Sequence, residues 1–162
     1  MIIAKLPPDE KKRLSALENL KLFNTKPEQN FDNITKLASF ICNMPVSLIT
    51  LLGEKKQWFK SKVGTDLCET DKDISFCSHA ILHPKELMEV KDSRKDLRFV
   101  DNPLTTDPIT PFIFYAGMPL IASNGAALGT LCVMDTKTNS LNNKQKEALK
   151  ALAKQVESLF EL

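Results

Sequence analysis

The chain has 162 residues, enough for one domain with a substantial core, and it carries 22 basic and 20 acidic side chains. The basic residues lie among acidic ones and form no stripe, so we expect no nucleic-acid partner. No apolar run reaches the roughly 20 residues that span a membrane, and the apolar N-terminus is too short for a signal peptide. We therefore expect one cytoplasmic domain over residues 1–162, without membrane contact.

The N-terminal quarter of the chain predicts two helices. Two prolines followed by two acidic residues are typical of a helix start, and leucines then recur at helical spacing, so we expect an N-terminal helix over residues 8–24. Thr25 and Glu28 have the spacing of a capping box, and apolar residues from Phe31 to Ile41 repeat at helical intervals. This pattern predicts a second helix.

The next segments favour extended structure. Residues 46–52 are apolar on both faces, which is typical of a central strand, and residues 57–63 alternate as a hairpin partner nearer the edge would. Residues 87–90 fit a short strand. Residues 91–111 have three prolines, many charges and no clear period, so we expect a long loop of the kind that wraps a site or is mobile.

The last third of the chain predicts a hairpin and a long helix. Asn124-Gly125 between the apolar runs 113–121 and 126–135 is a strong hairpin signal. Asn142 is a good N-cap for a C-terminal helix over residues 142–162. Together these elements predict an α+β fold in which helices pack on an antiparallel sheet.

The C-terminal helix carries an apolar seam at a 3-4-3 spacing, which fits either an ordinary amphipathic helix on the sheet or a helix that pairs with a second subunit. We assign the seam to a homodimer interface. Its members are Leu149, Leu152, Val156 and Leu159.

The segment 73–83 places a thiol and two imidazoles in one amphipathic stretch that fits a short helix. In that helix His79 and His83 would share a face, but Cys77 would point away from His79, and a closed zinc site needs four ligands. We expect no metal here. Instead, we expect His79 to bind a backbone carbonyl and His83, just before Pro84, to end the element.

The cysteines at positions 42, 68, 77 and 132 form no Cys-x-x-Cys pair, and we expect reduced, mostly buried thiols. No lysine or arginine lies within four residues of Cys77, and its apolar neighbours favour the neutral thiol. We therefore expect that Cys77 is not a catalytic nucleophile, and we assign no catalytic residue and no cofactor.

Seven segments, in order along nearly the whole chain, carry a family resemblance. They are residues 13–17, 31–35, 57–64, 73–83, 96–103, 114–120 and 128–135. Together they resemble a GAF domain of the kind found at the front of bacterial sensor histidine kinases and diguanylate cyclases. The resemblance implies a central antiparallel sheet of five or six strands, with the N- and C-terminal helices packed on one face. It implies a loop-covered pocket for a small ligand on the other face.

The candidate pocket residues are the few polar or aromatic side chains among apolar ones in the matching region. They are Phe76, Cys77, His79, Phe99, Tyr115, Thr130 and Cys132. Such residues are more often part of the core than ligand contacts, and Tyr115 in particular fits an aromatic filler with a bonded hydroxyl better than a ligand contact.

The resemblance implies a sensory domain that binds an unknown small molecule and signals through its terminal helices to an output domain or a partner kinase or cyclase. The sequence lacks the cyclic-nucleotide pattern of some GAF domains, and Ser78 separates Cys77 from His79 where bilin-binding members usually have Cys-His. Two alternatives stay open. One is a thiol-dependent redox enzyme similar to the free methionine sulfoxide reductases, and the other is a dimerisation module without a pocket.

Overall fold

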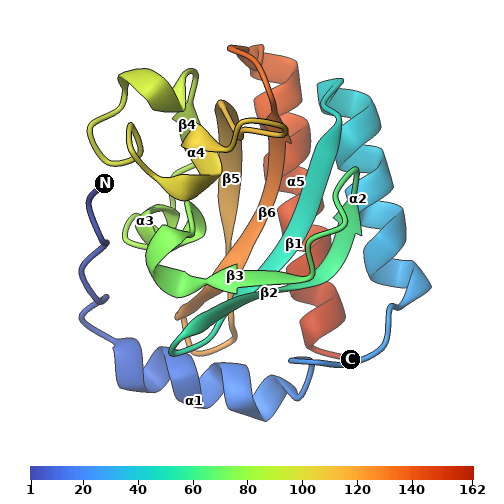
Figure 1. Cartoon of the computed structure of the whole chain (residues 1–162). Helices are drawn as coiled ribbons and strands as arrows, with labels where there is room; N and C mark the ends of the chain where they lie inside the picture. The colour runs from blue at the N-terminus through green and yellow to red at the C-terminus, as the bar shows by residue number, and fades with distance from the viewer.

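The computed structural model describes residues 1–162 and contains one antiparallel sheet of six strands in the order β3-β2-β1-β6-β5-β4 (Figure 1). The strands are β1 Val46–Leu52, β2 Lys56–Val63, β3 Glu69–Asp71, β4 Met88–Val90, β5 Phe114–Ile121 and β6 Ala127–Asp135. The helices are α1 Glu10–Leu20, α2 Gln29–Cys42, α3 Cys77–Ala80, α4 Pro103–Thr106 and α5 Asn143–Phe160. The predicted α+β fold is confirmed. None of the helices is both long enough and apolar enough to cross a bilayer.

The two central strands are the ones that the sequence marks as apolar on both faces. Every residue of β1 and of β6 is buried, because helices cover one side of the sheet and loops cover the other. The hairpin between β5 and β6 turns at Asn124 and Gly125, where Gly125 has a φ of 88° that favours glycine. Both sequence predictions are confirmed.

One face of the sheet is covered by α2 and α5, which lie side by side (Figure 1). This layer contains a large apolar cluster, with Phe31, Ile34 and Ala38 from α2 and with Leu149, Ala153 and Val156 from α5.

The N-terminal helix does not share that face. α1 lies across one end of the sheet (Figure 1), where Leu17 packs against Leu51, Trp58 and Leu128. Only Arg13 and Leu17 of α1 are buried, so its apolar side is too narrow to cover a sheet face.

The apolar seam of α5 faces its own chain, which corrects its assignment to a dimer interface. Leu149 and Val156 have no exposed surface, and Leu152 and Leu159 pack partly buried against the same cluster. A helix that lies on a sheet shows the same apolar period as a helix in a dimer seam, so spacing alone could not separate the two. The homodimer itself stays a prediction.

Of two helix starts that the sequence predicts, the structure confirms one and corrects the other. Asn142 caps α5, as predicted, and the Gln145 side chain accepts a hydrogen bond from the Asn142 backbone. The capping box at Thr25 is wrong, because α2 begins only at Gln29 and the Thr25 hydroxyl donates to the carbonyl of Leu22. The first helix is also shorter than the predicted range of 8–24.

A buried lysine accounts for the conformation of the linker between α1 and α2. Lys60 Nζ donates to Thr25 Oγ1 at 2.8 Å and to the Lys26 carbonyl at 2.7 Å, and it pairs with Glu28 at 2.6 Å. Lys60 can reach them because β2 has a bulge opposite Ile49 of β1, so its side chains do not alternate strictly as the sequence suggests.

Candidate functional site

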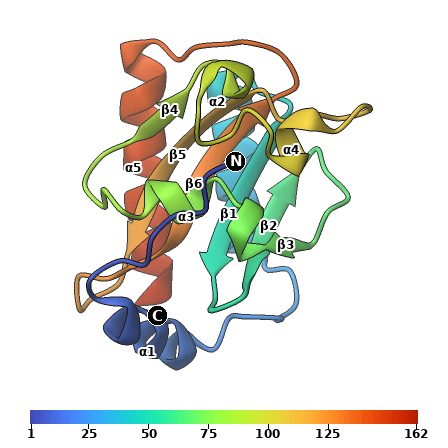
Figure 2. The same ribbon diagram turned by 60° about the vertical axis from the view of Figure 1, so that its left-hand side comes forward.

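The second face of the sheet is covered by α3, α4 and the loops around them (Figure 2). We call this layer the ligand face, because it contains the candidate pocket residues. Its apolar cluster joins Leu48, Phe59 and Cys132 of the sheet to Phe76, Phe99 and Phe112 of the covering segments. The long segment 91–111, predicted as a loop, includes the short turn Ser93–Lys95 and α4.

The helix expected around Cys77 is only four residues long, so the two histidines do not share a helix face. His79 is buried, and its Nε2–H donates to the carbonyl of Ile2 at 2.9 Å, which confirms the expected backbone partner. His83 is exposed after the helix end and lies 3.9 Å from Glu86. No group of three or more His, Cys, Asp or Glu side chains is arranged to hold a metal ion.

Aromatic side chains stack in the centre of the ligand face. The rings of Phe76 and Phe99 stack with centroids 4.2 Å apart, and the Tyr115 ring tilts against Phe76 at 5.3 Å. The His79 imidazole meets Phe99 edge-on at 5.1 Å. Gly117, two residues after Tyr115 on β5, leaves the space that the tyrosine hydroxyl occupies.

Two short chains of polar contacts cross this apolar layer. Thr130 shares hydrogen bonds with Thr50 at 3.1 Å and with Tyr115 at 3.2 Å. On the other side, the Cys77 thiol donates to Gln57 Oε1 at 2.7 Å, and Gln57 Nε2 donates to Thr70 at 2.9 Å. Each polar group in these two chains of contacts therefore has a partner within the protein.

A small cavity of about 10 Å³ lies between these groups. It has about the size of one water molecule, so the protein's own side chains fill the rest of the space. Of the seven candidate pocket residues, Phe76, Tyr115 and Cys132 line the cavity, and the other four do not. The sequence prediction missed the other seven residues that line it, which are Leu48, Gln57, Phe59, Thr70, Leu104, Phe112 and Met134.

Three of the four thiols are buried in the chain. Burial raises the pKa of Cys77 and the pKa of Cys42 to about 11, and it raises the pKa of Cys132 further. These thiols are therefore neutral near pH 7 and are poor nucleophiles in this conformation. Cys68 is exposed, with Lys62 Nζ 3.4 Å from its sulfur.

The sequence model of the GAF domain family matches residues 26–159. A cyclic di-GMP phosphodiesterase of Pseudomonas aeruginosa is 38% identical over 130 residues, which make up 80% of this chain and 22% of that protein. The chain thus spans about a fifth of the length of this curated relative.

Solved structures share the fold at low sequence identity. The GAF domain of an Acinetobacter phosphoenolpyruvate-protein phosphotransferase superposes with a TM-score of 0.65 at 14% identity, over 93% of each chain. The type II free methionine-R-sulfoxide reductase of Thermoplasma acidophilum superposes with a TM-score of 0.64, also at 14% identity, over 90% of this chain and 94% of that one.

Proposed function

Because the chain belongs to the GAF domain family, we propose that it is a sensory domain that binds a small molecule on its ligand face and signals through its terminal helices. The observation that carries the proposal is the composition of that face. The cavity there is lined mainly by apolar and aromatic side chains, and the few polar groups, Tyr115, Gln57 and Thr70, converge on it. This composition is typical of small-molecule sites.

The relative from Pseudomonas aeruginosa supports a regulatory use. This chain corresponds to about a fifth of that cyclic di-GMP phosphodiesterase, so a domain of this kind occurs as one part of a longer enzyme. We propose that the partner of this domain is likewise an output domain or a separate signalling enzyme. A thiol-based reaction gains no support from the ligand face, because Cys77 and Cys132 are buried with raised pKa values.

Native mass spectrometry of the protein purified from its own host tests the proposal. We expect a bound small molecule on the wild type and its loss in Thr70→Val, which removes the hydroxyl of a residue that lines the cavity at nearly constant volume. Thr136→Val is the matched control, because Thr136 is exposed outside this face and its hydroxyl has no hydrogen-bond partner. A wild type that carries no molecule would contradict the proposal.

The small volume of the cavity favours a second candidate, a dimerisation module without a pocket. With about 10 Å³ of free space, the ligand face holds no small molecule unless Phe112 or Leu104 moves. The same mass spectra separate the two candidates. The module predicts a dimer without any bound molecule, whereas the sensor predicts a bound molecule in either oligomeric state.

A further inference from the structure

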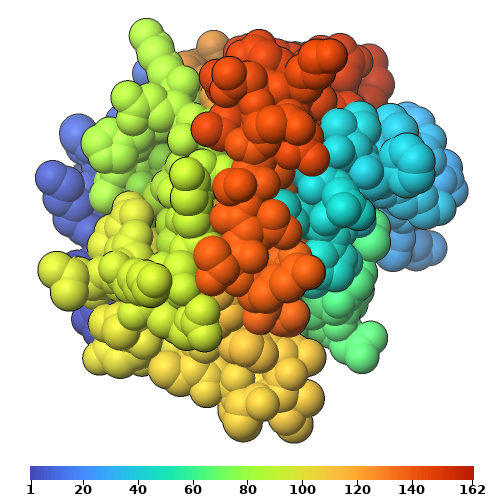
Figure 3. Space-filling view, turned by 90° about the horizontal axis from the view of Figure 1, so that it is seen from above, coloured from blue at the N-terminus to red at the C-terminus, as the bar shows by residue number.

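The linker between β6 and α5 runs beside β4, the last strand of the sheet, and beside the loop that follows it (Figure 3). Three contacts hold the two segments together in antiparallel order. Leu141 N donates to Glu89 Oε2 at 2.8 Å, and Asn139 N donates to the carbonyl of Lys91 at 3.4 Å. The Thr138 hydroxyl donates to Asp92 Oδ2 at 3.0 Å. We call residues 89–92 with 138–141 the linker zipper.

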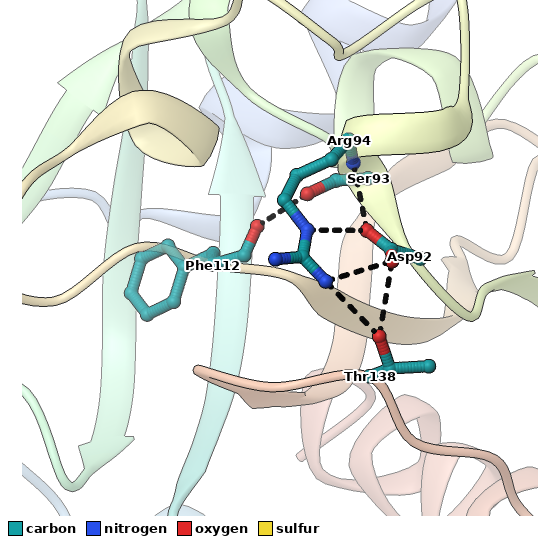
Figure 4. A network of polar contacts seen from close by, with 5 residues as sticks. All are labelled: Asp92, Ser93, Arg94, Phe112 and Thr138. Atoms are coloured by element: carbon teal, nitrogen blue, oxygen red, sulfur yellow. Dashed lines mark hydrogen bonds and ion pairs between the residues drawn. The ribbon is translucent and has the colours of Figure 1, made fainter.

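An arginine fixes the far end of the linker zipper (Figure 4). Arg94 Nε donates to Asp92 Oδ1 and its terminal nitrogen donates to Asp92 Oδ2, both at 2.9 Å. The same terminal nitrogen also donates to Thr138 Oγ1 at 3.3 Å. The hydrogen bonds from Arg94 hold the pKa of Asp92 well below its usual range, so the carboxylate stays charged at neutral pH.

Ser93 connects the linker zipper to the ligand face. Its amide donates to the carbonyl of Ile113 at 2.7 Å, and its hydroxyl donates to the carbonyl of Phe112 at 2.8 Å (Figure 4). The side chain of Phe112 lines the cavity. A molecule in the cavity that displaces Phe112 together with its backbone would therefore pull on Ser93 and on Asp92 beside it.

The other end of the linker zipper reaches the first turn of α5. Leu141 directly precedes the N-cap Asn142. In that first turn, Lys146 Nζ also lies 3.6 Å from Glu89 Oε1. One continuous set of contacts thus joins the cavity wall to the start of the last helix. The remainder of α5 is held by apolar packing on the sheet and on α2, and by the hydrogen bond that Ile121 N donates to Glu157 Oε2 at 3.0 Å.

We propose that the linker zipper is the connection through which a change on the ligand face reaches α5. Movement of Phe112 separates Asp92 from Thr138, and the start of α5 then loses its attachment to β4. The sensory use of this device rests on the proposed function. The connection itself is present in the ligand-free protein and is tested there.

Hydrogen exchange of the whole ligand-free chain, followed amide by amide, tests the connection. In Thr138→Val we expect the amides of Asn139, Leu141 and Arg94 to exchange roughly fivefold faster, the factor that one net hydrogen bond corresponds to. Thr138→Ser keeps the hydroxyl and restores the wild-type rates. Thr136→Val, two residues away in the same linker, leaves them unchanged.

Coupling between sites is reciprocal, so the opposite end of the linker zipper provides a second test. Glu89→Ala should speed exchange at the Arg94 amide, although Glu89 does not contact Arg94. A Leu141 amide unaffected by Thr138→Val, or an Arg94 amide unaffected by Glu89→Ala, overturns the inference. An equal rise at the sheet amide of Val133 also overturns it, because the loss of stability would then be general. A domain without a bound molecule but with coupled exchange would refute only the proposed function.

Discussion

His79 lies buried under the N-terminal segment, at the edge of the aromatic stack. Burial disfavours the imidazolium and lowers its pKa below the ordinary value of 6.5. The hydrogen bond to Ile2 opposes this shift, nearby Arg98 adds to it, and Asp96 opposes it. Arg98 and Asp96 are themselves paired at 2.7 Å. Because a carbonyl only accepts, the Nε2 atom of the neutral ring carries the proton.

This lowered pKa makes folding pH-dependent. Between the folded pKa and about 6.5, the unfolded chain binds more protons than the folded one, so the contribution of His79 is fully present above about pH 6.5 and is lost as the pH falls. We expect His79→Gln to show a weaker decline in the free energy of unfolding between about pH 7 and pH 5 than the wild type. Urea unfolding at several pH values measures this free energy, and His83→Gln, at an exposed histidine, is the control. Equal pH slopes in His79→Gln and the wild type would be evidence against this assignment.

The candidate site could be located from the sequence but not completed. Phe76, Tyr115 and Cys132 were found because they are aromatic or polar residues within apolar segments. Gln57 was missed, because an amide on a strand that alternates near the edge of a sheet reads as solvent-exposed. Only the folded chain, in which α3 lies on the sheet, places the Cys77 thiol against the Gln57 amide. That contact joins residues far apart in the chain, so no local pattern contains it.

At the scale of single elements, two local signals gave the correct structure because the contacts that form it are local. The turn at Gly125 and the cap at Asn142 depend on neighbours within three residues, and both were predicted. The capping box at Thr25 failed because α2 begins only at Gln29, and a distant side chain, Lys60, binds both Thr25 and Glu28. The α5 seam was misassigned for a different reason. The spacing of its apolar residues is the same whether they pack on the protein's own sheet or on a second subunit.

The seam of α5 gives the prediction for this scale. Leu149→Ala should lower the free energy of unfolding by about 2–5 kcal/mol, because Leu149 is fully buried against α2 and the sheet and a cavity would replace its side chain. Lys150→Ala, the exposed neighbour, is the control and should change stability little. Chemical unfolding gives the energies, and sedimentation velocity gives the oligomeric state. A variant that loses association but keeps its stability would show that Leu149 belongs to an interface.

In the whole molecule, α1 buries only two side chains, Arg13 and Leu17, and a buried ion pair helps to hold it in place. The side chain of Arg13 is fully buried and donates to the carbonyl of Leu52, at the end of β1, at 2.6 Å. It also donates two hydrogen bonds of 2.8 Å to the Glu10 carboxylate. Glu10 Oε1 in turn lies 3.9 Å from Nζ of Lys72, which precedes α3 in the chain. α1 is thereby connected to the sheet and to the ligand face at once.

Replacing Arg13 should therefore lower the free energy of unfolding more than replacing another residue of α1 would. Arg13→Met keeps much of the apolar stem but leaves the Leu52 carbonyl and the Glu10 carboxylate without their donor. A buried group that loses its partner costs more than the net value of the bond, so we expect a loss of about 2–4 kcal/mol. Lys12→Met, exposed on the same helix, is the control. Urea unfolding should show a lower midpoint with an unchanged slope. If Arg13→Met unfolds at the same urea concentration as Lys12→Met, α1 is held by Leu17 and its apolar neighbours alone.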